Sequence, residues 1–364
     1  MNKNTNKLFY TLVVVSAIFL VTLIAWVIPI NAYVETPGQA TDIRKYLTVN
    51  GKKDKTKGNL RLVSVYLSDA NIGDWIKSNF SPAYSIESKD EVTGGATDYE
   101  YEKISEYQMN NSIQNAEIQA FKLAGKSSEI KQNYHGIYIA QVMPNSEFKK
   151  LLKIGDTITK INGVHYTSSK DFQNALAKMS PGNKLNVTFV RNGETKTVTA
   201  KTVVLENTKT KENPKGRTGI GISLVDDTTL VTNPKVKVNI GEIGGPSGGM
   251  MFTLQLYSQL ANIDLKKGRN ISGTGTIESD GSIGEIGGID KKILAAKKAG
   301  STIFLTPYIK PTKSNVTLDG GKTNYQLAIE TAKKYAPGIK IVPVETIRDA
   351  VNFLEKGTII KVEK

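Results

Sequence analysis

The sequence predicts an α+β protein of several domains that begins with a membrane-spanning helix. Three observations support this prediction: a length of 364 residues, a composition with 39% hydrophobic and 23% charged residues, and one long uncharged apolar run near the amino terminus. The length suits two or three domains of ordinary size. The composition permits packed cores, so wholesale disorder is excluded.

The composition also excludes several kinds of chemistry. The chain has no cysteine and only two histidines, His135 and His165. Disulfides, cysteine nucleophiles and thiolate metal sites are therefore ruled out, and neither a metal nor a cofactor is expected. The 48 Lys and Arg exceed the 34 Asp and Glu, which leaves a net charge of +14. These basic residues are scattered without interleaved aromatic residues, so nucleic acid is not expected as a partner.

The amino terminus decides the expected compartment. Residues 8–30 read LFYTLVVVSAIFLVTLIAWVIPI without a charge, which is enough to cross a bilayer as a helix. Lysines precede this run and acidic residues follow it, so the positive-inside rule places residues 1–7 in the cytoplasm and residues 31–364 outside. We therefore expect a single-pass protein of the cell membrane with an extracytoplasmic body. A cleaved signal peptide is the alternative, although Ile30-Asn31-Ala32 is a poor cleavage site.

Two regions follow the expected anchor. Residues 31–121 contain a basic loop, a β-rich run and a polar helical stretch, and no pattern there indicates chemistry. Residues 126–205 read as strand, short helix, strand, hairpin, helix and two strands. Their clearest signal is the segment IGDTITKING at 154–163, in which apolar alternation predicts a strand and Asn-Gly predicts a tight hairpin.

This order of elements, with its G-D-x-I-x-x-I-N-G signature, resembles a PDZ domain. The resemblance implies a β-barrel-like domain with two helices that binds an extended peptide as an added strand. The residues expected to hold the peptide are Tyr134, His135, Gly136, Ile137, Tyr138 and Ile139. Because this turn departs from the usual G-Φ-G-Φ pattern, free carboxyl termini and internal segments both stay open as ligands.

A polar linker at 206–217 leads into the third region, residues 218–364, where a serine lies on a glycine-rich turn. Ser247 stands in the segment GPSGG at 245–249, just before an apolar run with the spacing of a buried helix. Unpaired N–H groups and the positive end of the helix dipole at such a place can stabilise an oxyanion. The segment also fits the G-x-S-x-G elbow of hydrolases, but both histidines precede the serine, so that interpretation fails.

Without histidine, the base expected for a serine nucleophile is a lysine. On the predicted helix that follows Gly287-Gly288, Lys292 shares one face with Ile289, Ile293 and Ala296 by helical spacing. A lysine in an apolar site loses hydration, which lowers the pKa of its ammonium and makes it a candidate base. Lys291 is expected to point elsewhere. From the periodicity alone, a lysine that extends past the helix edge into water stays open.

Several segments of the third region together resemble the proteolytic domain of Lon proteases, from about residue 218 to the end. They are the GPSGG turn, Thr274-Gly275-Thr276, the glycine-rich run at 281–289 and the lysine helix. The resemblance implies that Ser247 is the nucleophile, that Lys292 is the base and that Thr274 orients the lysine. Gly245, Pro246 and Gly248 would surround the oxyanion. Thr276 and Gly244 stand where the family has acidic residues.

The combination of one anchor, a PDZ domain and a Lon-type domain resembles the anchored PDZ-containing Lon-type serine peptidases of Gram-positive bacteria. No G-x-x-x-x-G-K-[ST] motif accompanies it, so no nucleotide is expected as a partner. The resemblance implies an ATP-independent endopeptidase with a Ser-Lys dyad that cleaves exported peptides or proteins, among them secreted signalling peptides. It also implies that residues 31–121 complete the protease fold and that the PDZ domain is an insertion. A non-catalytic PDZ scaffold or chaperone and an esterase are the alternatives.

Overall fold

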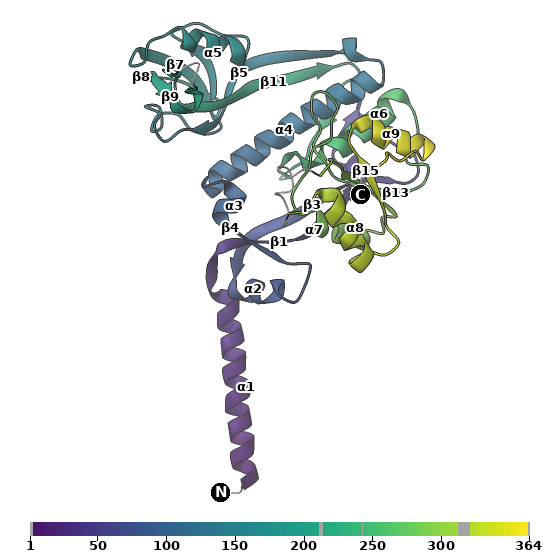
Figure 1. Cartoon of the computed structure of the whole chain (residues 1–364). Helices are drawn as coiled ribbons and strands as arrows, with labels where there is room; N and C mark the ends of the chain where they lie inside the picture. Colours follow the sequence, from purple (N-terminus) through teal and green to yellow (C-terminus); the bar gives the residue numbers. More distant parts are fainter. Residues whose placement is uncertain (1–2, 211–213, 242, 312–320, 363–364) are drawn as a thin grey trace.

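The computed structural model describes residues 3–210, 214–241, 243–311 and 321–362. Helix α1 (Lys3–Val27) projects away from the body (Figure 1), and apolar side chains such as Phe9 and Leu12 are exposed on it. No helix in these ranges is long and apolar enough to cross a membrane, so the spanning segment expected at 8–30 is not supported. The helix ends before Pro29 because proline disfavours helical geometry at the residue that precedes it, and Pro29 and Ile30 belong to the first strand.

A six-stranded mixed sheet forms the centre of the larger domain, in the order β15-β14-β13-β3-β1-β4. The strands are β1 (Pro29–Asp42), β3 (Asn59–Asn71), β4 (Ser85–Ser88), β13 (Asn270–Gly273), β14 (Ile303–Pro307) and β15 (Lys340–Val344). The pairs that join β3 to β1 and β1 to β4 are antiparallel, and those that join β3, β13, β14 and β15 are parallel. Strands from residues 29–88 and from residues 270–344 therefore share one sheet.

Six of the described helices pack against this sheet, and a seventh, α4, packs on one of them, α6 (Figure 1). They are α2 (Ile72–Ser78), α3 (Lys89–Thr93), α4 (Asp98–Leu123), α6 (Gly249–Ala261), α7 (Ile289–Lys298), α8 (Asn324–Tyr335) and α9 (Ile347–Lys356). Helix α6 is buried along nearly its whole length, as its apolar sequence predicts. It packs against α4, whose buried side chains include Met109, Ala116 and Phe121. The long helix α4 is thus part of the core of the larger domain.

A second, inserted domain contains a five-stranded sheet in the order β11-β5-β6-β7-β8. Its elements are β5 (Ile130–Val142), β6 (Thr157–Ile161), α5 (Ser169–Ala177), β7 (Lys184–Arg191), β8 (Glu194–Lys201) and β11 (Ile222–Thr232). A short pair of strands, β9 (Val203–Leu205) and β10 (Arg217–Gly219), adjoins it. One core of apolar residues, with Phe148, Phe172 and Phe189 at its centre, holds this domain together.

The inserted domain is connected to the larger one by a long antiparallel ribbon of β5 and β11 (Figure 1). The ribbon begins shortly after α4 and returns to β12 (Val236–Val238), which pairs with β2 (Leu47–Val49) in the larger domain. The boundary expected at residue 218 is therefore wrong, because β11 belongs to the sheet of the inserted domain. The physical reason is that β11 covers one edge of β5 along its whole length.

Candidate active site and peptide groove

Ser247 lies in a short 3-10 turn, Pro246–Gly248, which runs directly into α6. The turn requires glycine before it, because Gly245 has a φ of 80°, a conformation that residues with a Cβ rarely adopt. Pro246 then occupies the first position of the turn, where its fixed φ suits helical geometry. Ser247 is half-buried, next to the N–H groups that begin α6 and have no acceptor within the helix.

Lys292 meets Ser247 from α7. Its Nζ lies 3.1 Å from Ser247 Oγ and 3.4 Å from Thr274 Oγ1, and the residue is 4% exposed. Ile289, Ile293 and Ala296 are fully buried on the same helix, so the apolar stripe that the spacing predicts is present. The lysine therefore points into the protein rather than into water.

Lys291 points elsewhere, as expected, but it is also buried. Its Nζ contacts Ser85 Oγ and lies 2.6 Å from a carboxylate oxygen of Asp290. The two consecutive lysines thus occupy different environments, and the one beside Ser247 is Lys292.

Thr274 connects the serine turn to the sheet at the end of β13. Its Oγ1 donates a hydrogen bond to the carbonyl oxygen of Ser247 at 3.1 Å, and the N–H of Gly275 donates to the same oxygen at 2.8 Å. Because Thr274 is fully buried, these two bonds hold the serine backbone in one place. Thr274 Oγ1 is also within reach of Lys292, so the structure brings all three side chains together.

The two positions that depart from the Lon pattern have local explanations. A Cβ at Gly244 would lie 3.0 Å from the Cβ of Ser105 on α4, so that helix fills the space of a side chain there. Thr276 accepts a hydrogen bond from the N–H of Gly284 and donates one to Glu278. In this chain Thr276 therefore stabilises its own loop.

Helix α4 supplies contacts to the serine turn that the sequence did not indicate. Ser112 Oγ donates to the carbonyl oxygen of Pro246 at 2.8 Å, and the N–H of Gly245 donates to the carbonyl oxygen of Ser105 at 2.9 Å. Ser112 is 3% exposed. These bonds fasten both sides of Pro246 to α4, and no sequence pattern at Ser105 or Ser112 signals such a role.

An acidic residue lies close to the start of α7. Burial, with a smaller contribution from the nearby Glu87 carboxylate, raises the pKa of Glu35 to about 7, although Lys291 and Lys292 oppose the increase. The carboxylate packs against Gly288, where a Cβ would lie 2.5 Å from Glu35 Oε1. Across the described ranges, no group of three acidic or histidine residues could hold a metal ion.

A cleft of about 510 Å³ opens beside Ser247 and Lys292. One wall is β3 from Leu62 to Leu67, and Met109 and Ile243 contribute apolar surface. The pairing of β3 with β13 stops at Leu62 and Gly273, so among the described strands β3 has no neighbour on that side beyond Leu62. An exposed strand edge thus faces the serine, which is a geometry that accepts an extended peptide.

The residues expected to hold a peptide in the inserted domain lie inside its sheet. Ile137 and Tyr138 pair with β6 on one side and with β11 on the other, so they have no edge for an added strand. A Cβ at Gly136 would lie 2.3 Å from the carbonyl oxygen of Ile158, which explains this glycine by packing against β6. His135 contacts Thr229 on β11. The assignment of Tyr134, His135, Gly136, Ile137, Tyr138 and Ile139 to the peptide site is therefore wrong.

A groove suited to a peptide lies instead between β11 and α5. It has a volume of about 260 Å³, and residues 217–224 line it opposite Gln173, Leu176 and Ala177 of α5. The turn before β11 reads Gly219-Ile220-Gly221-Ile222, which is the G-Φ-G-Φ pattern that Tyr134–Ile137 lacks. Gly221 has a φ of 67°, and a Cβ there would lie 2.9 Å from Ser146. The pattern lies directly after the expected linker, within the range 218–364 that the sequence predicts for the third region.

Both domains match known families. Residues 121–202 match the PDZ domain, and residues 227–319 match the Lon protease (S16) C-terminal proteolytic domain. The crystal structure of the PDZ domain of an SdrC-like protein from Listeria monocytogenes is 25% identical, with a TM-score of 0.23, over 26% of this chain and 90% of that one. The corresponding domain from Listeria innocua is also 25% identical, with a TM-score of 0.21, over 24% and 92%.

Two curated relatives match parts of the chain. The Lon protease of Neorickettsia sennetsu is 28% identical over 109 residues, which cover 30% of this chain and 11% of that protein. The periplasmic serine endoprotease DegP of Salmonella typhimurium is 30% identical over 139 residues, which cover 38% of this chain and 26% of that protein. The chain thus matches only a minor part of either relative. It combines a PDZ domain with a proteolytic domain of the Lon type, and these matches support a serine peptidase.

Proposed function

We propose that the protein is an ATP-independent serine endopeptidase in which Ser247 is the nucleophile and Lys292 is the general base. The observation that carries this proposal is the 3.1 Å separation between Lys292 Nζ and Ser247 Oγ on a lysine that is 4% exposed. Burial penalises the charged form of an amine, and a neutral amine can accept the hydroxyl proton. The absence of a nucleotide-binding motif from the sequence supports the independence from ATP.

The proposed reaction follows from this geometry. Neutral Lys292 removes the proton of Ser247 as Oγ attacks the carbonyl carbon of the substrate, and N–H groups of the turn stabilise the oxyanion. The protonated lysine then gives its proton to the leaving amine as the peptide bond breaks. Water attacks the acyl-enzyme, Lys292 takes its proton, and the serine is regenerated. Thr274 keeps the nucleophile and the base aligned.

The substrate class follows from the cleft beside Ser247. We propose that an extended segment of an exported peptide or protein pairs with the free edge of β3 between Val63 and Leu67. Strand addition supplies main-chain hydrogen bonds that do not depend on the side chains of the substrate. The neighbouring cleft, with Met109 and Ile243 in its wall, would then accept an apolar side chain.

We further propose that the groove between β11 and α5 recruits the substrate. A peptide there would pair with β11, and the turn Gly219–Ile222 would hold its carboxyl terminus by backbone N–H groups. Binding to this domain raises the local concentration of substrate near Ser247 on the same chain. A wild-type chain that binds peptides and cleaves none would instead be a scaffold.

The dyad is tested by three variants of the full-length chain. Ser247→Ala and Lys292→Met should each abolish cleavage of unfolded protein substrates while the melting temperature shows that the fold persists. The matched control is Lys291→Met, which removes the adjacent buried ammonium from the same helix and should leave cleavage within several-fold of wild type. Full activity in either dyad variant would refute the assignment, and an inactive Lys291→Met would move the base to Lys291.

The recruitment site is tested with labelled peptides that carry a free or an amidated carboxyl terminus. The turn Gly219–Ile222 predicts that only the free acid binds, as measured by fluorescence polarisation on the Ser247→Ala chain. Equal binding of both peptides would indicate that internal segments are the ligands.

Membrane attachment is a separate proposal. We propose that the uncharged run at 8–30 holds the chain at the cell membrane, with residues 1–7 in the cytoplasm and the body outside. The apolar side chains exposed on α1 support it. Fractionation tests it: the chain should stay with membranes at alkaline pH, and externally added protease should digest the body on intact cells. Recovery of the intact chain in the soluble fraction would contradict the proposal.

A further inference from the structure

The groove between β11 and α5 has a defined length, which the backbone of β11 sets. The carbonyl oxygen of Gly221 accepts a hydrogen bond from Met143 at the end of β5, so Gly221 faces that strand. Because successive residues of a strand direct their N–H and C=O groups to alternate sides, Ile222, Leu224 and Asp226 present theirs on the opposite edge. This edge faces α5. The N–H of Ser169, in the first turn of α5, donates a hydrogen bond to the Asp226 carboxylate at 2.7 Å.

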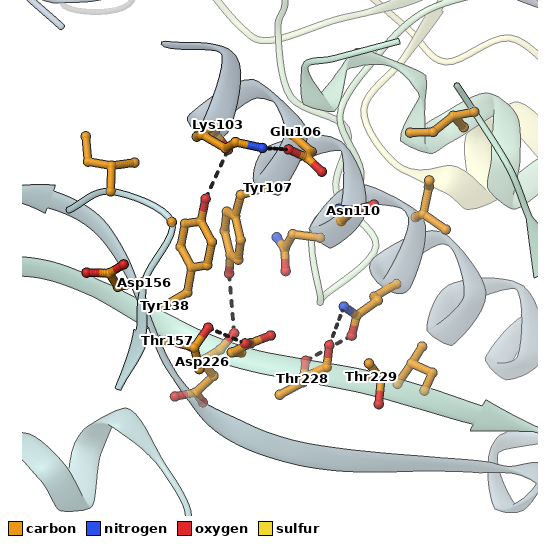
Figure 2. Close-up of a pocket in the computed structure, with 18 of the residues that line it drawn as sticks. Lys103, Glu106, Tyr107, Asn110, Tyr138, Asp156, Thr157, Asp226, Thr228 and Thr229 are labelled. Carbon is orange, nitrogen blue, oxygen red and sulfur yellow. Dashed lines mark hydrogen bonds and ion pairs between the residues drawn. The ribbon is translucent and has the colours of Figure 1, made fainter. Parts of the chain in front are cut away.

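At Asp226 the free edge is taken up by side chains of α4. Tyr107 Oη donates to the carbonyl oxygen of Asp226 at 3.4 Å, as the dashed line in Figure 2 shows. Two residues further along β11, Gln114 Nε2 donates to the carbonyl oxygen of Thr228 at 2.8 Å, and Thr228 Oγ1 donates back to Gln114 Oε1 at 2.9 Å. The acceptors that a longer added strand would use are therefore occupied from Asp226 onward.

These side chains are held firmly. The ring of Tyr107 stacks on that of Tyr138 from β5, with centroids 4.3 Å apart. Helix α4 itself is buried in the protease core along its other face, and Ser112 fastens it to the turn that carries Ser247. A peptide that binds β11 cannot displace Tyr107 by moving the helix without disturbing that core.

We infer that Tyr107 and Gln114 form a stop that limits the peptide bound along β11 to roughly five residues, the number that faces Ile222–Asp226 in an antiparallel pair. This inference rests on the proposed recruitment by the β11–α5 groove. It makes these two residues of the protease domain determinants of what the inserted domain binds. Residues of a longer substrate beyond the stop leave the strand edge and gain no further main-chain bonds there.

Beyond the stop lies open space. A cleft of about 530 Å³ separates α4 from the β5–β11 ribbon, and Tyr99 is part of its wall. Asn110 and Thr228 also line it (Figure 2). Removal of the Tyr107 and Gln114 side chains would therefore open the edge onto existing space rather than onto a packed core. The prediction is that their removal lengthens the usable edge.

The test compares peptides of four, five, six and eight residues that share one carboxyl-terminal sequence, on full-length chain carrying Ser247→Ala. In this background the affinity should rise up to about five residues and then stay within about twofold. With Tyr107→Ala and Gln114→Ala added, the eight-residue peptide should bind about fivefold to tenfold more tightly, as expected for one or two new hydrogen bonds, and the four-residue peptide should be unchanged.

Two further variants keep the result interpretable. Tyr107→Phe removes only the hydroxyl group and should give a smaller gain in affinity for the eight-residue peptide. This variant replaces the double variant if the latter does not fold. Tyr99→Ala is the matched control, because this tyrosine lines the same cleft and should leave the length dependence unchanged. If the affinity of the chain that carries only Ser247→Ala keeps rising up to the eight-residue peptide, the stop is refuted, whereas recruitment by the groove stands. If no peptide of any length binds, the recruitment proposal fails and the stop fails with it.

Discussion

The two faces of α4 make opposite kinds of contact. Toward the protease core the helix presents small and apolar side chains that are almost fully buried, such as Ala116 and Phe121. Toward the inserted domain it presents half-buried or exposed polar residues such as Tyr107 and Gln114, beside a cleft of about 530 Å³. The buried face therefore holds the catalytic turn in one geometry, whereas the polar face adjoins water and room for a ligand.

One helix can therefore serve two domains, because its two faces make contacts of different strength. Buried contacts are expensive to break, because cavities and unpaired polar groups each destabilise the fold. Contacts beside an open cleft exchange with water at little net cost. Mutations on the two faces should consequently differ in the property that they change.

The largest effect is expected from Phe121→Ala on the buried face. Phe121 is fully buried in the core shared with α6, so its truncation should lower the free energy of unfolding by about 3–5 kcal/mol. Tyr99→Ala on the cleft face removes a ring that is 55% exposed and should change stability by about 0.5 kcal/mol at most. Urea denaturation measures both values. Equal losses would contradict the contrast between the faces.

A smaller, pH-dependent effect is expected at Glu117, which lines the cleft. Burial raises the pKa of Glu117 from 4.5 to about 7. The carboxyl thus ionises at a lower pH in the unfolded chain than in the folded one. The free energy of unfolding therefore falls as the pH rises from about 4.5 to 7. Above pH 7 the free energy of unfolding is lower than at pH 4 by at most about 3 kcal/mol from this group.

Glu117→Gln removes the group that causes this loss. The variant should be more stable than wild type at pH 8 and equal to it at pH 4, as measured by urea denaturation at both values. The exposed Glu102 on the same helix provides the control, since Glu102→Gln should change stability little at either pH. A stabilisation by Glu117→Gln that is the same at pH 4 and pH 8 would contradict the titration mechanism.

Local sequence patterns indicated Ser247 and Lys292 separately, and the resemblance to the proteolytic domain of Lon proteases implied that the two residues act together. The segment GPSGG places glycines where a sharp turn needs them, and the spacing of Ile289, Lys292, Ile293 and Ala296 defines one helix face. Neither signal depends on how distant segments pack. The two residues lie 45 positions apart, yet the structure brings their side chains to 3.1 Å.

The errors concern features that chain order does not determine. Gly219–Ile222 carries the expected pattern, but β11 joins the sheet beside β5, after the rest of that domain in sequence. Order along the chain therefore pointed to Tyr134–Ile139, which lie between two neighbouring strands. Ser112 was missed for a related reason, because a serine in a polar helical stretch has no local sign that it faces another segment.

The smallest effect, and the sharpest test of the buried face, is expected at Ser112. Ser112→Ala removes the bond from Oγ to the carbonyl oxygen of Pro246, which is one of the contacts that fix the turn before Ser247. A turn that is free to shift should align the nucleophile less well, so we expect kcat to fall about tenfold with KM nearly unchanged.

The control lies two helical turns away on the same face. Ser105 contacts Gly245 only through its backbone carbonyl among the described bonds, so Ser105→Ala should keep that contact and full kcat. A purely structural role for Ser112 would lower the melting temperature and the active fraction without lowering kcat per folded enzyme, and that outcome would remove α4 from the control of the catalytic turn.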